Sequence, residues 1–331
     1  MSPPTPERRS ADDPPGLSDL RDAHSDPAAS TPERSARRAL DPAALARVQR
    51  RLQRAAQPPW LHGEVARRMA QRLPVIRLQP RCIVDWGAFL GASQGLLRQT
   101  YPRATLLAVE RDAPRCEATA QALRQPWWSV QRWRGAGASA LVAAQLQPGC
   151  AQLLWSNMVL HGVIDPQAEM AAWHRALEVD GFLMFSTLGP GTLRSLSELY
   201  AAQHWPVPLA PLVDMHDLGD MLVQAGFADP VMDQETITLT WATARALLDE
   251  LRGLGGNVDP RRGAGLRTPR WRAGLEKLLS LQARADGRVA LDFELVYGHA
   301  FRPAPRAKMA ARTELPLDDM RAMVRGTGRR A

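Results

Sequence analysis

Short apolar runs alternate with helical patterns along the middle of this 331-residue chain, and this alternation restricts the fold more than any other feature. The predicted strands are Cys82–Asp85, Thr105–Glu110, Trp128–Trp133, Ala151–Ser156 and Phe182–Thr187. The predicted helices between them are Gln94–Thr100, Ala113–Leu123, Ala138–Gln145 and Gln167–Leu177. Strands and helices that alternate at this spacing form βαβ units, so the sequence predicts an α/β fold with a mostly parallel sheet.

Further elements are predicted on both sides of this region. Residues 41–73 have a helical pattern that Pro58 and Pro59 divide into two helices. A helix at Asp217–Ala225 precedes strands at Ile237–Trp241 and Leu291–Gly298, and a helical, Arg-rich segment at 242–288 separates these two strands. Two late strands without a simple crossover predict an antiparallel edge strand, which mixed sheets often carry.

The two ends of the chain differ from the middle in composition. Residues 1–38 are rich in Pro, Ser and Asp without apolar periodicity, so a disordered tail is expected. Residues 303–331 form a basic tail without aromatic residues on which nucleic-acid bases could stack. A solvated, disordered tail is therefore the simpler interpretation. No uncharged apolar run reaches the length of a membrane span. We therefore predict neither a nucleic-acid nor a membrane partner.

The cysteines and histidines do not indicate a metal site. Cys82, Cys116 and Cys150 are far apart and lack the paired spacing of metal ligands. The histidines show no clustered spacing such as H-x-x-x-H. Dispersed cysteines of this kind suit a reducing compartment, so a cytoplasmic location is expected.

A glycine-rich turn follows the first predicted strand. Asp85 ends the strand, and Gly87, Gly91 and Gly95 follow before the next helix. A strand, a glycine turn and a helix can bind a nucleotide-like ligand, because glycine lets the backbone approach it closely. The spacing differs from the dinucleotide pattern G-x-G-x-x-G. From this motif alone, a ligand-binding turn and an ordinary strand-to-helix turn both remain open.

Polar residues at two further strand ends extend this candidate site. Glu110 ends the second strand about 20 residues beyond the glycine turn, where an acidic residue can accept hydrogen bonds from ribose hydroxyls. Together with the turn, Glu110 favours a ligand that contains adenosine. Ser156 and Asn157 end the fourth strand and are candidates to face the same crevice. Their alternative role is loop capping, which is common for these residue types.

Several longer blocks resemble the malonyl-[acyl-carrier protein] O-methyltransferases of the biotin pathway, which are class I S-adenosylmethionine-dependent methyltransferases. The resemblance runs from about residue 48 to 303 and includes the blocks GEVARRMAQRL (63–73), LLWSNMVLHGVIDP (153–166), GFLMFSTLGPGTLRSL (181–196), LLDELRGLGGN (247–257) and FELVYGHAFRP (293–303). It implies a Rossmann-like seven-stranded sheet in a domain at 39–302, with residues 242–288 as a helical lid. It also implies S-adenosyl-L-methionine as the cofactor, bound by Asp85, Gly87, Gly91, Glu110, Ser156 and Asn157.

The same resemblance implies a reaction and a partner. The methyl group of S-adenosylmethionine goes to the free carboxylate of malonyl-[acyl-carrier protein], an early step of pimeloyl and biotin synthesis. A malonyl carboxylate is already ionised at neutral pH, so the reaction needs no general base. An arginine fork would hold this carboxylate, and Arg261 and Arg262 are the candidates.

Four departures from the family pattern touch the cofactor or the substrate. Phe89 stands where the turn usually has its middle glycine, and no Tyr follows the RAA segment at 54–56. Pro211 and Leu212 stand where Arg-Phe is usual, and the acidic residue expected after the third strand falls near Gly137. These departures leave two alternatives open, a catalytically degenerate homologue that acts as a binding or scaffold protein and a methyltransferase for another small carboxylate.

Overall fold

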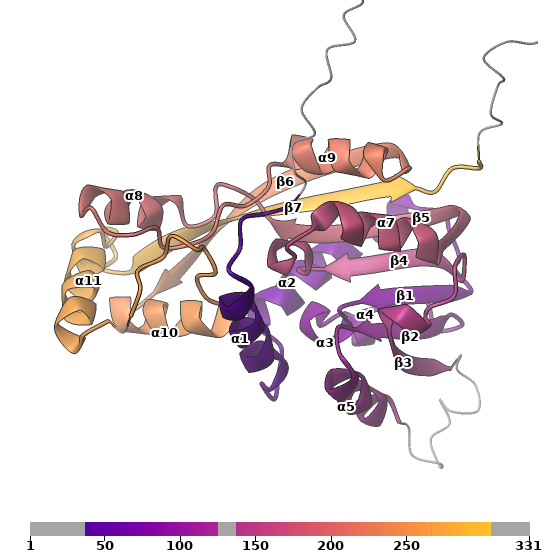
Figure 1. Cartoon of the computed structure of the whole chain (residues 1–331), viewed down its shortest axis with the longest axis horizontal. Helices are drawn as coiled ribbons and strands as arrows, with labels where there is room; N and C mark the ends of the chain where they lie inside the picture. The colour runs from indigo at the N-terminus through magenta and orange to yellow at the C-terminus, as the bar shows by residue number, and fades with distance from the viewer. Residues whose placement is uncertain (1–36, 125–136, 266, 306–331) are drawn as a thin grey trace, which may run out of the picture. The chain divides into compact units, whose positions relative to one another are not determined.

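A computed structural model of the chain describes residues 37–124, 137–265 and 267–305 (Figure 1). The predicted strand at Trp128–Trp133 and nearly all of both predicted tails lie outside these residues. None of the helices in the described part of the chain combines the length and the apolar character that a membrane span requires.

The described part of the chain forms one mixed sheet of seven strands in the order β3-β2-β1-β4-β5-β7-β6, visible from bottom to top in Figure 1. The strands are β1 (Cys82–Trp86), β2 (Thr105–Glu110), β3 (Ala138–Val142), β4 (Ala151–Asn157), β5 (Leu177–Leu188), β6 (Ala228–Trp241) and β7 (Val289–Phe301). Pairs among β1 to β5 are parallel, whereas β7 is antiparallel to both β5 and β6. The predicted mostly parallel sheet is confirmed, and its antiparallel strand lies one position inside the edge.

Several helices of the described residues begin at a capping side chain. The helices are α1 (Pro42–Gln53), α2 (Trp60–Ala70), α3 (Ala88–Gly91), α4 (Gln94–Thr100), α5 (Ala113–Leu123), α7 (Pro166–Ala176), α8 (Arg194–Ala202), α9 (Met215–Gln224), α10 (Ala244–Leu254) and α11 (Pro269–Leu281). Asp41, Asp112, Asp165 and Thr268 cap α1, α5, α7 and α11 with side-chain oxygens, and each of these helices has proline in its first two positions. Both features satisfy or remove backbone donors that a helix start leaves unpaired.

The predicted helix at Ala138–Gln145 is wrong. Ala138–Val142 forms β3, and Ala143–Gln145 is a single 3-10 turn. Alanine favours a helix locally, but β3 pairs in parallel with β2 from Leu106 to Glu110, and this tertiary pairing overrides the local preference. The small side chains of Ala138 and Ala140 also pack with Leu123 of α5.

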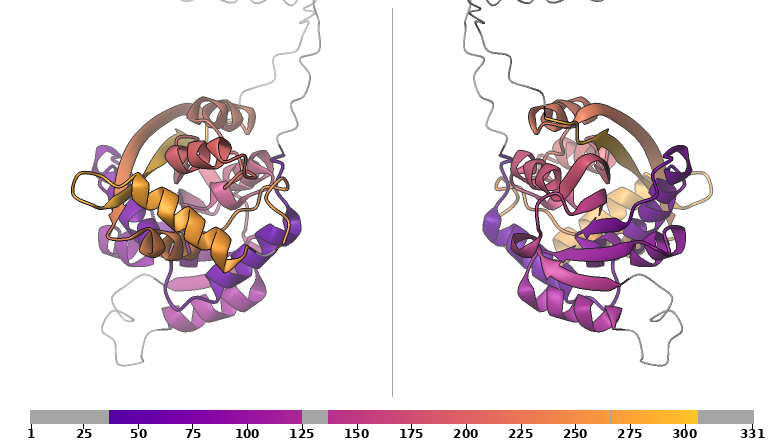
Figure 2. Two further views of the ribbon diagram at one scale, coloured as in Figure 1. Left: turned by 90° about the vertical axis from the view of Figure 1, so that its left-hand side faces the viewer. Right: turned by 90° about the vertical axis from the view of Figure 1, so that its right-hand side faces the viewer.

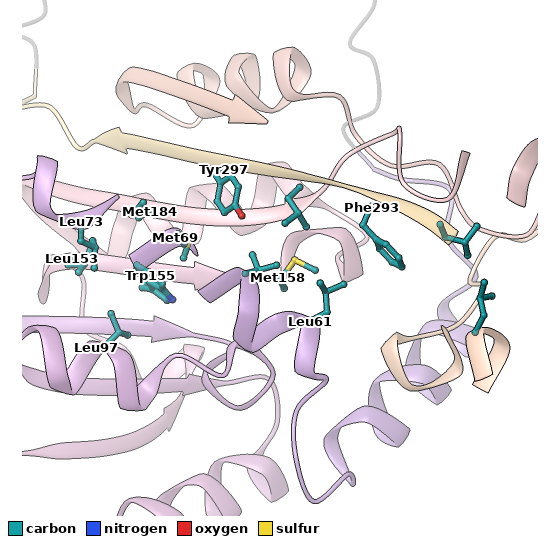
Figure 3. Close-up of a cluster of buried hydrophobic side chains, with 14 of the residues drawn as sticks. Leu61, Met69, Leu73, Leu97, Leu153, Trp155, Met158, Met184, Phe293 and Tyr297 are labelled. Atoms are coloured by element: carbon teal, nitrogen blue, oxygen red, sulfur yellow. The ribbon is translucent and has the colours of Figure 1, made fainter. Parts of the chain in front are cut away.

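The central strands bury side chains on both faces of the sheet, because successive residues of a strand point to opposite sides. In β4, Leu153 and Trp155 pack on one side with Met69 of α2, whereas Leu154 packs on the other side with Trp173 of α7. Figure 3 shows the first of these clusters. Helices cover both faces, so the ends of the strands are the places where a ligand can reach the sheet.

The strands β6 and β7 form a hairpin arm that continues past the pairing with β5. β5 pairs with β7 from Leu295 to Phe301, whereas β6 pairs with β7 as far as Val289. We call Thr236–Trp241 of β6 and Val289–Glu294 of β7 the hairpin arm. The helices α10 and α11 connect its two strands and lie at the end that faces the viewer in the left panel of Figure 2.

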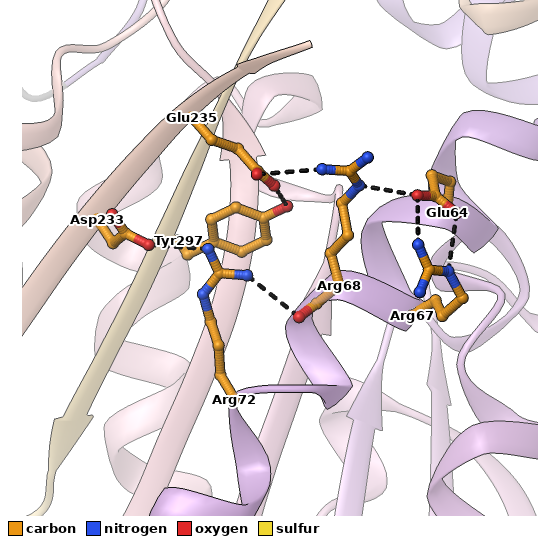
Figure 4. Close-up of polar contacts among 7 residues, drawn as sticks. All are labelled: Glu64, Arg67, Arg68, Arg72, Asp233, Glu235 and Tyr297. Atoms are coloured by element: carbon orange, nitrogen blue, oxygen red, sulfur yellow. Dashed lines mark hydrogen bonds and ion pairs between the residues drawn. The ribbon is translucent and has the colours of Figure 1, made fainter.

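A polar network joins α2 to β6 and β7 (Figure 4). Arg68 binds Glu64 at 2.8 Å and Glu235 at 3.1 Å, and the Tyr297 hydroxyl donates to Glu235 at 2.6 Å. The Arg72 guanidinium lies 3.9 Å from the centre of the Tyr297 ring. Burial, followed by the bond to Glu235, raises the pKa of Tyr297, so its hydroxyl stays a donor at neutral pH. The network fixes the face of α2 against the sheet.

Candidate functional site

A cavity of about 730 Å³ lies beyond the carboxyl ends of the parallel strands. Gly87, Leu90 and Glu110 line one part of it, and Tyr200, Leu248 and Trp271 of the helices α8, α10 and α11 line another. The same cavity therefore connects the glycine turn with the helices at the end of the hairpin arm. A binding crevice at this place is what an open α/β sheet provides.

The glycine turn is built around Gly87. Its backbone has a φ of 73°, and an added Cβ would lie 2.5 Å from Cγ2 of Val159. Its N–H donates to the Val109 carbonyl at 2.8 Å, which places the turn beside the end of β2. Gly91 closes α3 with a 2.8 Å bond to the Gly87 carbonyl, and a Cβ there would meet Asn157 at an ordinary distance of 3.6 Å. Only Gly87 is therefore required to be glycine by its own geometry.

Asp85 lies at the end of β1, fully buried beneath this turn. Neither of its carboxylate oxygens has a hydrogen-bond partner among the described residues. Burial, with a smaller contribution from Glu110, raises the pKa of Asp85 well above its usual range. A buried carboxylate without a donor is costly when ionised, so this position suits a nearby cationic group of a ligand.

Glu110 lines the cavity at the end of β2. Its Oε1 accepts hydrogen bonds from the Phe89 N–H at 3.0 Å and from the Thr119 hydroxyl at 2.7 Å. No described residue hydrogen-bonds its Oε2. Burial raises the pKa of Glu110, while the two hydrogen bonds oppose that shift. The side chain is thus fixed through one of its two oxygens.

The predicted residues Ser156 and Asn157 do not line the cavity. Asn157 donates to the carbonyls of His62 at 2.7 Å and Gly91 at 2.6 Å, and it accepts from the Ser186 hydroxyl at 2.6 Å. Its side chain connects α2, the glycine turn and β5. The Ser156 hydroxyl is buried without a partner among the described residues. Of the six predicted cofactor residues, Gly87 and Glu110 reach the cavity surface, and the other four lie behind it.

Phe89 occupies the position of the usual middle glycine without closing the cavity. Its ring packs against the Arg115 guanidinium, 3.7 Å from the ring centre, and does not line the cavity. Its backbone N–H meanwhile holds Glu110. The loop therefore accommodates the larger side chain by turning it toward α5.

The two predicted carboxylate-binding arginines are bound to acidic residues of the chain. Arg261 binds Asp259 through Nε and Nη2 at 3.1 and 3.0 Å, and its side chain is 68% exposed. Arg262 lines the cavity but binds Asp41 at 2.6 Å. Both positive charges are therefore already balanced within the protein.

Arg38, His62 and His161 also line the cavity, and none of them was predicted from the sequence. The two imidazole rings lie 6.2 Å apart, edge to face, and His62 Nδ1 hydrogen-bonds the Leu90 carbonyl at 2.7 Å. Burial lowers the pKa of His62 to about 4 and that of His161 to about 3, so both are neutral at neutral pH. Their one sequence signal is position, since His161 lies in the conspicuous block 153–166 and His62 precedes the block 63–73.

The strand order, the cavity at the carboxyl ends and the acidic residue that ends β2 are those of the class I S-adenosylmethionine-dependent methyltransferase fold. No family model matches the chain. Solved structures similar to it include the YcgJ protein of Bacillus subtilis, with 11% identity, a TM-score of 0.47 and coverage of 74% of this chain and 100% of that chain. Another is phosphoethanolamine N-methyltransferase 2 of Haemonchus contortus, with 15% identity, a TM-score of 0.43 and coverage of 72% and 52%.

Curated relatives are much closer in sequence. The malonyl-[acyl-carrier protein] O-methyltransferase of Laribacter hongkongensis is 38% identical over 270 residues, which cover 80% of this chain and 88% of that protein. The proteins of the same name from Gallionella capsiferriformans and Halorhodospira halophila are 37% and 36% identical over 253 and 244 residues, and cover 74% and 73% of this chain and 85% and 81% of their own lengths. The chain belongs to the malonyl-[acyl-carrier protein] O-methyltransferase family.

Proposed function

We propose that this chain transfers the methyl group of S-adenosylmethionine to the free carboxylate of malonyl-[acyl-carrier protein] in the cytoplasm. The product is a methyl ester that enters pimeloyl and biotin synthesis. The observation that carries the proposal is that one continuous cavity extends from Gly87 and Glu110 to the helices α10 and α11. A cofactor bound at the sheet and an acceptor bound beneath the helices could meet in such a cavity. The free thiols of Cys82, Cys116 and Cys150 are consistent with a reducing compartment.

The residues at the sheet end fit this cofactor. Glu110 offers Oε2 to the ribose hydroxyls, as an acidic residue at this strand end can do. Burial favours the neutral form of Asp85, and the positive charges of the cofactor would favour its ionised form if they came to lie near the turn. Gly87 keeps the backbone free of a side chain where the ligand approaches.

The reaction asks the chain to position and desolvate its substrates. When bound, S-adenosylmethionine supplies a methyl group on a positively charged sulfur, which keeps the electron pair when the carbon–sulfur bond breaks. The acceptor carboxylate is ionised at neutral pH, so no residue has to remove a proton. His62 and His161 are neutral and buried, so they shape the cavity without providing a positive charge that would bind the carboxylate. Correct placement of two reactants can contribute several kcal/mol to such a step.

We further propose that α10 and α11 form a lid over the acceptor. Their aromatic and aliphatic side chains, among them Leu248, Leu251 and Trp271, line the cavity. Arg51, Arg252 and Arg267 also line it and are exposed to solvent. Because carrier proteins are acidic, exposed arginines at the cavity wall suit docking and steering of this partner.

The test is methyl transfer by the purified full-length chain with S-adenosylmethionine and malonyl-[acyl-carrier protein], with the methyl ester detected by mass spectrometry. Acetyl-[acyl-carrier protein] has no free carboxylate and is the matched negative control. An active malonyl-[acyl-carrier protein] O-methyltransferase is run in parallel. If that enzyme forms the ester and this chain forms none above background, the proposed function is wrong.

Titration calorimetry with S-adenosylmethionine separates this function from a degenerate binding protein. Four departures from the family pattern motivate the degenerate homologue, and the ring of one of them, Phe89, lies outside the cavity lining. We expect saturable binding at one site. Absent binding by the folded protein would favour the degenerate homologue.

A further inference from the structure

Arg38 is held at the cavity wall by backbone carbonyls from distant parts of the chain. Its Nη1 donates to the His161 carbonyl at 2.5 Å and to the Val163 carbonyl at 3.4 Å. Its Nη2 donates to the Pro211 carbonyl at 2.7 Å. Its own backbone N–H donates to the Ile164 carbonyl at 2.7 Å. These bonds place the guanidinium precisely enough to serve as a fixed binding group.

The positive charge of Arg38 has no ion-pair partner among the described residues. Each hydrogen bond that it makes goes to a neutral carbonyl, and its Nε is buried without an acceptor in this part of the chain. Burial lowers the pKa of Arg38 to about 10, so the group remains charged at neutral pH. A desolvated, unpaired cation is costly unless an anion joins it.

The unused donors of Arg38 lie on the edge of the guanidinium that binds carboxylates elsewhere in this protein. Arg67 uses Nε and Nη2 to bind Glu64 at 3.0 and 2.7 Å, and Arg261 uses the same two atoms to bind Asp259. In Arg38, Nε has no acceptor among the described residues, and Nη2 keeps a second proton after its bond to the Pro211 carbonyl. Because Nε is buried, a carboxylate in the cavity can bind this guanidinium through the remaining proton of Nη2.

Arg38 also lies in the part of the cavity that leads to the glycine turn. It contacts His161, whose ring packs edge to face with His62, and His62 hydrogen-bonds Leu90 of the turn. All four residues line the same cavity. The other arginines considered for this role, Arg261 and Arg262, are bound to carboxylates of the protein.

We propose that Arg38 binds the free carboxylate of the acceptor and thereby makes the enzyme select malonyl over acetyl thioesters. This inference rests on the proposed function, because it concerns the acceptor of that same reaction. The carboxylate accepts a hydrogen bond from Nη2 of Arg38 through one oxygen, and its other oxygen remains available to receive the methyl group. The three carbonyl bonds keep the guanidinium in place during turnover.

The experiment compares Arg38→Met and Arg38→Lys with the wild type and with the control Arg37→Met. Arg37 is the neighbouring arginine, with a 76% exposed side chain that lies 3.4 Å from Asp165, so its variant loses the same charge without touching the cavity lining. Dissociation constants for malonyl- and acetyl-[acyl-carrier protein] are measured by calorimetry in the presence of S-adenosylhomocysteine. KM and kcat are measured with malonyl-[acyl-carrier protein].

We expect Arg38→Met to weaken binding and raise KM for the malonyl substrate about 10- to 100-fold, which is the range for hydrogen bonds to a charged group. Binding of acetyl-[acyl-carrier protein] and of S-adenosylmethionine should stay within about threefold of the wild type. Arg38→Lys keeps the charge and loses the fork, so an intermediate loss of malonyl preference is expected. Arg37→Met should keep the wild-type preference.

A folded Arg38→Met variant that still prefers the malonyl over the acetyl carrier protein as the wild type does would overturn the proposal. If Arg38→Met does not fold, an unchanged preference in Arg38→Lys overturns it. Loss of affinity for both carrier proteins alike would show a structural role and would also contradict it. Failure of the proposed function is distinguishable, since the wild type itself would then form no methyl ester.

Discussion

Replacing Gly87 with alanine adds a methyl group at a place where both the backbone and the packing oppose it. The φ of 73° lies in the left-handed region, where a residue with a Cβ loses about 1–2 kcal/mol. The new Cβ would stand 2.5 Å from Cγ2 of Val159, and overpacking of this kind costs about 1–3 kcal/mol. We therefore expect Gly87→Ala to lower the free energy of unfolding by about 2–5 kcal/mol.

Denaturant unfolding of the purified variants measures this loss. Gly95→Ala is the matched control, because Gly95 lies in α4 with no atom within 4 Å of the added Cβ, and alanine there should maintain or increase stability. In a double-mutant cycle, Val159→Ala removes the side chain that the new Cβ would meet. In that background Gly87→Ala should cost only the backbone strain of about 1–2 kcal/mol. A loss below about 1 kcal/mol for Gly87→Ala would refute the reasoning, since neither contribution could then be as described.

Burial raises the pKa of Asp85 well above its ordinary value of 3.8, so the stability that its protonated form contributes is present below pH 3.8 and lost as pH rises through the folded-state pKa. Asp85→Asn should match the wild type at low pH and become the more stable protein as pH rises; denaturation curves across pH check this, and a constant difference would contradict it. Asn157→Ala removes three hydrogen bonds and should cost about 2–4 kcal/mol in thermal or chemical unfolding, whereas Ser156→Ala should change stability by less than about 0.5 kcal/mol. Equal losses in the two variants would argue against the connecting role of Asn157. Phe89→Ala should leave the dissociation constant of S-adenosylmethionine within about threefold, because the ring packs on Arg115 outside the cavity lining; a gain above about tenfold in calorimetry would show that the ring obstructs the cofactor.

The strands that were predicted correctly are those whose burial can be recognised from neighbouring residues in the sequence. The bounds of β2, Thr105–Glu110, were predicted without error, and those of β1 and β4 differ from the structure by one residue at one end. These strands are buried on both faces, so they are continuous apolar runs between polar turns. The strand β3 differs. Its alanines pack against α5, and its strand conformation depends on the pairing with β2, which the local sequence does not reveal.

The candidate site was predicted only as far as its strand ends. Gly87 and Glu110 are at the cavity because strand and turn place them there. Arg38 could not be found in this way, since its bonds reach residues 123 and 173 positions further along the chain. Arg262 was predicted as a free cation for a related reason, because its partner Asp41 lies 221 positions away. Charge balance inside a cavity is a property of the folded chain.

The position of β7 between β5 and β6 sets an order for assembly during synthesis. β6 has no pairing with β5 and gains its sheet partner only when Val289–Phe301 emerges from the ribosome. Until then β5 and β6 both lack this partner strand, and unpaired strand edges favour aggregation. The helices α10 and α11 are made in this interval, before the strand that closes the hairpin arm beneath them. The last described strand thus completes the sheet and also brings Phe293 to the cavity wall.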